Sequence, residues 1–118
     1  MAKTINRYFQ LLSSSRDVKP SARLWDPAAD IYTAPDGWLV KVELAGVSAE
    51  DIEIEIVDSC LTLSGTRRDR VAERGVSYHR MEITYSRFEK TIQFPKSIEG
   101  ASVETSFDNG LFLVRVRK

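Results

Sequence analysis

The side chains that most often act as bases, nucleophiles or metal ligands near neutral pH are scarce in this sequence. It contains one histidine, His79, and one cysteine, Cys60. A catalytic histidine needs a nucleophile and an orienting group, and the sequence has no G-x-S-x-G motif. One histidine and one cysteine also cannot complete a four-ligand zinc site. We therefore interpret His79 as a surface or interface residue and Cys60 as a packed turn residue, and we expect no metal.

The carboxylates give the next arrangement that could do chemistry. Glu53 and Glu55 are two residues apart, which would place both on one face of a strand. They alternate with Ile52, Ile54 and Ile56, so their simplest interpretation is the solvated face of a half-buried strand. No phosphate-binding G-x-x-x-x-G-K-[ST] loop occurs. We expect no catalytic residues, no cofactor and no use of ATP.

Arginines are concentrated between residues 66 and 80. They lie at positions 67, 68, 70, 74 and 80, against only Asp69 and Glu73, a local net charge of +3. Binding of single-stranded nucleic acid usually adds stacking aromatics, and Tyr78 is the one candidate in this stretch. A solvated loop or a protein contact is the favoured interpretation, and nucleic acid is an unlikely partner.

The whole chain has the size and composition of one folded domain. Its 118 residues include 17 basic and 17 acidic side chains, so its formal net charge is zero. That balance argues against a dedicated nucleic-acid or membrane binder and is compatible with self-association. The single cysteine favours a reducing compartment, and no run of 18 apolar residues occurs. We expect a cytoplasmic protein without a membrane partner.

Residues 1–24 differ in pattern from the rest and are interpreted as an N-terminal arm. Ile5, Tyr8, Phe9 and Leu12 recur at helical spacing, which predicts a short amphipathic helix. Residues 13–20, with three serines and Pro20, then predict a flexible link. A helix this short needs a surface to lie on, either its own domain or a partner chain.

From residue 25 onward the pattern alternates with the period of a β-strand. Trp38, Val40, Val42 and Leu44 would share one face. Further strands are predicted at residues 52–56, 61–63, 78–85, 91–94, 103–107 and 111–116. Short strands separated by turns indicate an all-β sandwich or a small barrel.

Turn residues separate these predicted strands. Asn109-Gly110 is typical of a type I′ hairpin, and Pro35-Asp36-Gly37 precedes another strand. Residues 48–51 could form one helical turn. Residues 66–77 lack alternation and predict a long exposed loop, which in a small domain usually serves function or assembly.

An ordered series of short motifs lies at residues 25–27, 30–32, 40–47, 50–52, 61–65, 78–80, 88–90, 94–95 and 105–112. Through this series, residues 25–118 resemble the α-crystallin domain of small heat-shock proteins. Thr105, Ser86 and Arg117 depart from the usual alanine, glycine and proline of the family. Family members typically carry an I-x-I tail motif; none follows here before Lys118, which puts large assemblies built through tail docking in doubt.

The resemblance implies an immunoglobulin-like β-sandwich and an ATP-independent chaperone (holdase) that binds partially unfolded proteins and prevents their aggregation. A holdase needs accessible apolar surface but no reaction centre. The arm would bind clients through Ile5, Tyr8, Phe9, Leu11 and Leu12. A second client site would be the family's edge groove, formed here by Ile52, Ile54, Ile56, Val103, Thr105 and Phe107.

The resemblance also implies a homodimer formed by strand exchange through the long loop, at about residues 66–82. Tyr78, His79, Arg80, Met81 and Glu82 would add as a strand beside Asp30, Ile31 and Tyr32 of a partner chain. Higher homo-oligomers are left open. The alternative function is a co-chaperone-like docking module of related sandwich fold, which would bind one folded partner and ignore unfolded clients.

The net charge of zero is the sum of separate segments of opposite charge. Residues 1–24 carry +4, residues 26–58 carry −8 and the arginine-rich loop carries +3. We expect the loop to reach toward the acidic residues 26–36 of a partner, and the arm to settle on an acidic body. Salt should weaken the exposed contacts.

Overall fold

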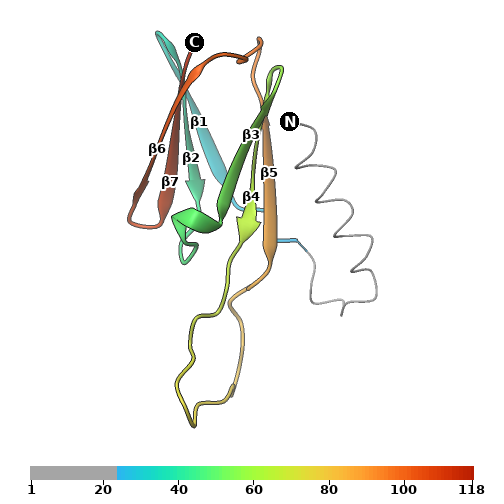
Figure 1. The fold of residues 1–118 in the computed structure, drawn as a ribbon, viewed down its shortest axis with the longest axis vertical. Coiled ribbons are helices and arrows are strands. Elements are labelled where there is room, and N and C mark those ends of the chain that lie inside the picture. The colour runs from blue at the N-terminus through green and yellow to red at the C-terminus, as the bar shows by residue number, and fades with distance from the viewer. Residues whose placement is uncertain (1–23) are drawn as a thin grey trace.

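The computed structural model describes residues 24–118 as two antiparallel β-sheets packed face to face. The first sheet has the order β1-β2-β7-β6, with β1 at Ala29–Ala34, β2 at Gly37–Glu43, β7 at Leu111–Arg117 and β6 at Ser102–Asp108. The second has the order β3-β4-β5, with β3 at Ile52–Val57, β4 at Cys60–Thr66 and β5 at Arg87–Gln93. Figure 1 shows the two layers side by side, with a long loop projecting beyond them. The predicted all-β sandwich is confirmed, whereas the predicted helix of the arm lies outside the described residues.

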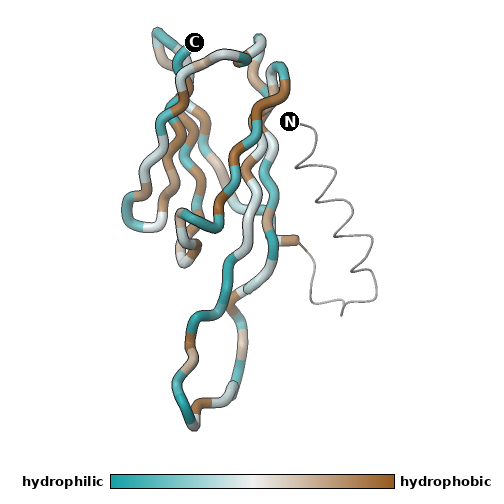
Figure 2. Tube along the Cα trace, in the orientation of Figure 1, coloured by the Kyte–Doolittle hydropathy of each residue, from teal (hydrophilic) through white to brown (hydrophobic). Residues whose placement is uncertain are grey.

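The core forms where the alternating apolar residues of the two sheets meet. Val40 of β2 lies opposite Val114 of β7, and Val42 lies opposite Phe112, and all four side chains are buried. Leu61 and Leu63 of β4 belong to the same buried cluster. Figure 2 shows the alternation of hydrophobic and hydrophilic residues clearly along β3, whose sequence is IEIEIV. The predicted inward face of β2 is therefore confirmed.

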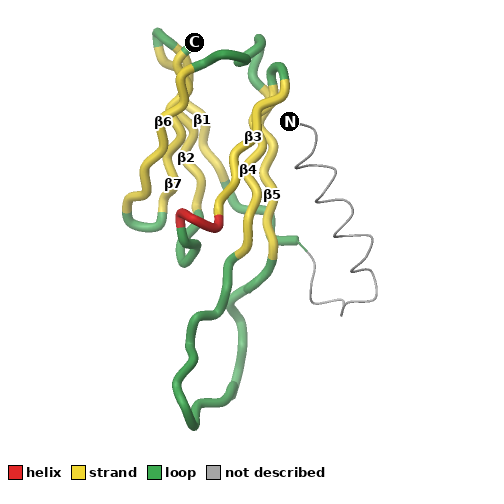
Figure 3. Tube along the Cα trace, in the orientation of Figure 1, coloured by secondary structure: helices red, strands yellow, loops and turns green. Residues whose placement is uncertain are grey.

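The turns follow the backbone preferences of their residues. Asn109 and Gly110 have φ values of 50° and 81°, as a type I′ hairpin requires, and they join β6 to β7. Ala34 pairs with Gly37, so Pro35 and Asp36 form the two-residue connection between β1 and β2. The single helical turn is a 3-10 helix, η2, at Ala49–Asp51 (Figure 3).

One predicted strand is wrong in extent, and another is absent from the described chain. The strand predicted at residues 91–94 begins earlier, because β5 pairs with β4 from Arg87 to Gln93. Residues 78–85 form no strand in the described chain and belong to an exposed loop instead. A strand needs the hydrogen-bonding edge of a neighbour, and no described strand of this chain lies beside that segment.

The prediction for β3 was wrong for one of its two glutamates. Glu53 is exposed, but Glu55 retains only 8% of its surface. Ile52, Ile54 and Ile56 point inward yet are only partly buried. β3 is the edge strand of its sheet, so its inward side chains have neighbours on one side only.

Gly65 of β4 provides a test of how tightly this strand packs against η2 and the Phe88 ring. A β-carbon at this position would lie 2.2 Å from the backbone oxygen of Asp51 and 2.9 Å from the Phe88 ring. We expect Gly65→Ala to lower the free energy of unfolding by about 2–3 kcal/mol, because the backbone atom cannot move aside without displacing η2. Urea denaturation measures this loss.

Gly75 in the long loop is the matched control. A β-carbon there would meet no atom within 4 Å, although its φ is +83°. Gly75→Ala should cost about 1–2 kcal/mol, less than Gly65→Ala, because only the positive φ opposes it. Equal losses for the two variants would contradict close packing at Gly65.

Candidate interaction surfaces

The longest loop of the domain carries an unusual amount of exposed apolar surface. It connects β4 to β5 and spans residues 67–86, four residues beyond the predicted end at residue 82. Exposed on it are Val71, Val76, Tyr78, Met81, Ile83 and Tyr85. Tyr78 exposes 71% of its surface. A loop that only served solvation would be polar, so these side chains mark an interaction surface.

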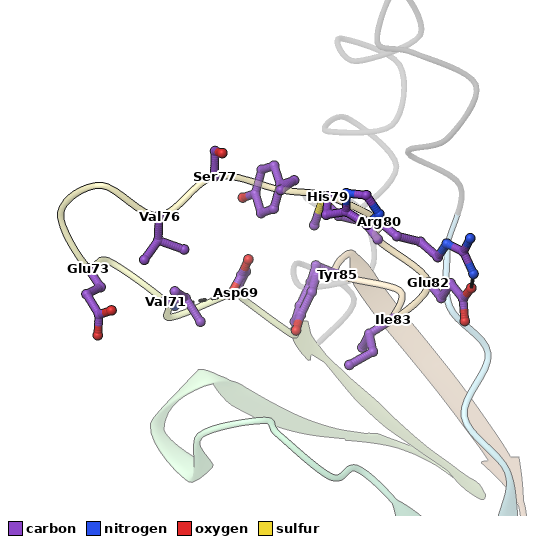
Figure 4. A pocket seen from close by; sticks show the side chains of 12 residues that line it. Asp69, Val71, Glu73, Val76, Ser77, His79, Arg80, Glu82, Ile83 and Tyr85 are labelled. Carbon is purple, nitrogen blue, oxygen red and sulfur yellow. Dashed lines mark hydrogen bonds and ion pairs between the residues drawn. The ribbon is translucent and has the colours of Figure 1, made fainter.

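A cavity of about 410 Å³ lies between the two legs of this loop (Figure 4). Val71, Val76 and Tyr85 line it together with polar residues that include His79. Among residues 24–118 no three potential metal ligands lie close enough together to hold a metal ion. The cavity therefore gives His79 an amphipathic surrounding, in which the lining residues include Ser77 and Tyr85.

Arg67 fastens the base of the loop to the sandwich. Its guanidinium lies 3.8 Å from the centre of the Trp25 ring, Nε donates to the Thr84 carbonyl at 2.8 Å, and Nη1 donates to the Ala45 carbonyl at 3.2 Å. The side chain thus joins the start of the domain, the β2–η2 turn and the returning leg of the loop. Sequence reasoning missed this role, because no local pattern distinguishes Arg67 from the other loop arginines.

Two further arginines bind the carboxylate of η2. Arg70 Nη2 lies 2.9 Å from Asp51 Oδ2 and donates to Ser48 Oγ at the same distance, while Arg68 Nε lies 3.5 Å from Asp51 Oδ2. These arginines were expected to reach the acidic segment of a partner. In the described chain Arg68 and Arg70 lie at Asp51, because the loop leaves β4 directly beside η2, and the expected contact with a partner stays a prediction.

The edge strand β1 offers a second exposed surface. Ile31 is 49% exposed although it lies opposite Val40 and points to the core side, and Tyr32 is also exposed. Lys41 Nζ lies 5.3 Å from the centre of the Tyr32 ring, and the Tyr32 hydroxyl raises the pKa of Lys41 through a hydrogen bond. Ile31 and Tyr32 thus present apolar surface, with Asp30 next to them, beside a strand edge that is unpaired within the described chain.

The predicted edge-groove residues lie on β3 and β6, which are edge strands of the two different sheets. Val103 and Phe107 of β6 are half-buried against the core, as are the three isoleucines of β3. Thr105 lies opposite Val114 and so points inward, yet it is exposed. Both strands therefore leave inward-facing positions incompletely covered.

The other predicted client site lies outside the described residues. It consists of Ile5, Tyr8, Phe9, Leu11 and Leu12.

Comparison with known sequences assigns the β-sandwich to a protein family. Residues 30–118 match the Hsp20/alpha crystallin family, which is about three quarters of the sequence. The chain belongs to this family. The match begins at β1 and includes both sheets and the long loop.

Individual relatives agree with the family match. The chain is 30% identical over 92 residues to small heat shock protein C2 of Rickettsia felis, covering 78% of this chain and 60% of that protein. It is 30% identical over 111 residues to the 17.6 kDa class I heat shock protein 1 of Arabidopsis thaliana, covering 92% and 68%. Among the curated relatives, a class IV heat shock protein of Pisum sativum is matched over about half of its length (51%).

Solved structures share the fold. Heat shock protein 16.0 from Schizosaccharomyces pombe superposes with a TM-score of 0.68 at 28% identity, covering 80% of this chain and 87% of that one. A small heat-shock protein from Xylella fastidiosa gives a TM-score of 0.65 at 22% identity, covering 81% and 88%, and supports the fold alone. Within residues 24–118, no helix has the length and apolar character needed to cross a membrane.

Proposed function

We propose that this protein is an ATP-independent holdase of the cytoplasm, which binds partially unfolded proteins and keeps them from aggregating. Membership of the Hsp20/alpha crystallin family supports a chaperone role. The observation that carries the proposal is the concentration of exposed apolar side chains on the long loop and on β1. Such surface suits the binding of apolar segments of varied shape, and binding of this kind needs neither a catalytic residue nor a cofactor.

Two client sites follow from this proposal. The apolar stripe of the arm would hold exposed hydrophobic segments of a client. The edges of β3 and β6 would accept an extended client segment by strand addition, with main-chain hydrogen bonds giving affinity and inward-facing positions receiving its side chains. The partly buried Ile54 and the exposed Thr105 are where such a segment would gain apolar contact.

The functional unit in this proposal is a strand-exchanged dimer. Residues 78–82 carry the exposed Tyr78 and Met81, and β1 carries the exposed Ile31 and Tyr32. Addition of residues 78–82 of one chain to β1 of another would satisfy backbone groups at both edges and cover these four side chains. Higher oligomers built from this dimer are compatible with the proposal.

Suppression of client aggregation tests the holdase function. The purified chain should prevent heat-induced light scattering of an unrelated client protein without ATP. Thr105→Glu should weaken this protection several-fold, because the carboxylate would be placed on the inward side of β6 where a client strand would pack. Ser106→Glu is the matched control, since residue 106 is equally exposed but points away from the core side.

The outcomes separate the candidate functions. If the unaltered chain fails to suppress aggregation at any ratio, the holdase proposal is overturned in favour of a docking module that binds one folded partner. If Thr105→Glu and Ser106→Glu protect equally, the chain can still be a holdase, but the edge groove is not its client site. Each variant should retain the cooperative unfolding of the parent, which circular dichroism checks.

A further inference from the structure

The outward face of the three-stranded sheet is polar, and three of its residues, Glu55, Thr62 and Ser64, are buried. Strand pairing places Glu53 and Glu55 of β3, Thr62 and Ser64 of β4, and Glu89 of β5 on this face. Thr62 keeps only 3% of its surface exposed and Ser64 only 6%. These exposures are typical of a core, whereas the outward face of a two-layer sandwich normally meets water.

No described element accounts for this burial. Residues 24–118 form two layers, and the strands of the other sheet pack against the opposite, apolar side of β3-β4-β5 (Figure 1). The Thr62 hydroxyl contacts the Thr91 hydroxyl at 3.2 Å, a contact within the face itself. We interpret the low exposure of Thr62 and Glu55 as the mark of a further segment lying across this part of the face.

The charge of the face indicates what kind of segment would fit. It carries three glutamates and, among the described residues, the single cation Arg87 at one end. One carboxylate oxygen of Glu89, Oε2, is buried without a hydrogen-bond partner in the described chain. Burial raises the pKa of the Glu89 carboxyl. A basic segment would relieve this desolvation, and an acidic or purely apolar one would not.

The chain itself supplies such a segment at this edge. The Trp25 N–H donates to the Arg87 carbonyl at 2.9 Å, and the Trp25 ring lies 5.7 Å from the ring of Phe88. Residue 24 therefore joins the domain at the edge of β5, next to Glu89. Residues 1–23 that precede it carry five basic side chains and one acidic one.

We propose that residues 1–23 dock on the outward face of β3-β4-β5 of their own chain, with their basic side chains over its glutamates. Twenty-three residues are enough to cross three strands even as a helix, which rises about 1.5 Å per residue. In the predicted helix, Lys3 and Arg7 are four residues apart and lie on the side opposite the stripe of Ile5, Tyr8, Phe9 and Leu12. Docking through the cations leaves that stripe directed away from the sheet. The proposal does not depend on holdase function.

Limited proteolysis of the full chain measures the docking. Trypsin cleavage after Arg7 and Arg16 should be slow at low salt and faster at high salt, because salt screens the ion pairs. The triple variant Glu53→Gln, Glu55→Gln, Glu89→Gln should be cleaved on the order of tenfold faster at low salt, since three ion pairs are lost together. Its cleavage should no longer respond to salt.

A second triple variant controls for net charge. Glu43→Gln, Glu104→Gln, Asp108→Asn removes the same number of carboxylates from the outward face of the other sheet. It should be cleaved like the parent. The single variant Glu89→Gln should be cleaved faster than the parent, but by a smaller factor than the triple variant. Because this change is conservative, the single variant still tests the docking if the triple variant unfolds. Equal cleavage of the parent, Glu89→Gln and both triple variants would overturn the proposal.

Photocrosslinking identifies the occupant of the face. Cys60, the single cysteine, lies on this face at the start of β4 and is partly exposed, so it accepts a benzophenone maleimide. Isotopically light and heavy chains are mixed before irradiation. Crosslinks should then join Cys60 to residues 1–23 that carry the same isotope label as that cysteine. Crosslinks predominantly between different labels would show the arm of a second copy on the face, and crosslinks only to other segments would show another occupant. Either result overturns docking within one chain.

Discussion

A chain lacking residues 67–82 should be monomeric, whereas the full chain should form a dimer. The deletion removes the proposed exchange strand together with most of the exposed apolar loop. It should leave the sandwich folded, because Thr66 and Arg87 are paired and residues 83–86 remain as a four-residue hairpin connection. Multi-angle light scattering should report a mass near that of one chain for the deletion and twice the 13.4 kDa chain mass for the parent.

A milder variant tests strand exchange itself. Arg80→Pro with Met81→Pro removes two successive N–H groups, so one donor toward the partner is lost whichever way the strand faces. It should shift the dimer toward monomer. Ala72→Pro with Glu73→Pro at the tip of the same loop is the matched control and should remain dimeric. A dimer that persists after both the deletion and the 80–81 change would exclude the loop as the dimerisation element.

Removal of residues 1–20 should cause the largest loss of client protection. The removed segment contains Ile5, Tyr8, Phe9, Leu11 and Leu12, and burying a side chain of this size contributes about 1.5–3 kcal/mol. Loss of even one such contact weakens binding by about tenfold. We expect at least tenfold more truncated chain to be needed for equal suppression of aggregation, measured by light scattering.

Substitutions within the arm distinguish the contribution of its apolar stripe from that of the arm's length alone. Changing Ile5, Tyr8, Phe9 and Leu12 to serine should reproduce most of the loss. Changing the polar residues Thr4, Asn6 and Gln10 to serine is the control and should preserve protection. Full activity of the truncated chain would place client binding in the described domain, at the loop or at the edges of β3 and β6.

The strands that pack against a core were the most predictable part of the fold. Trp38, Val40 and Val42 recur at every second position, with Lys41 and Glu43 on the other face, and this period of two is sufficient to assign an inward face when that face is fully covered. The hairpin at Asn109-Gly110 was equally predictable, because few residue pairs accept two successive positive φ values. Both features depend on local preferences that do not change with tertiary context.

The predictions that were wrong concern residues whose environment is set by distant segments. Residues 78–85 have the composition of a strand, but a strand requires a neighbouring edge, and none lies beside them in the described chain. Glu55 alternates like a solvated residue but is buried, because burial depends on what lies across the outward face. The contacts of Arg68 and Arg70 with Asp51 were likewise not predicted, since Asp51 lies beside the loop only after β3 and β4 have paired.

The sequence by itself determined the all-β class, the strands that line the core, the tight hairpins and the resemblance to small heat-shock proteins. It also determined a scarcity of catalytic side chains. Only the tertiary structure decided that Arg67 joins Trp25 to the loop, that β1, β3 and β6 are the exposed edges, and that polar residues of β4 are buried on the outward face. The physical reason is the distance along the chain over which each effect acts, since side-chain alternation and turn geometry depend on only a few neighbouring residues. Edges, ion pairs and burial depend on segments that come together only when the chain folds.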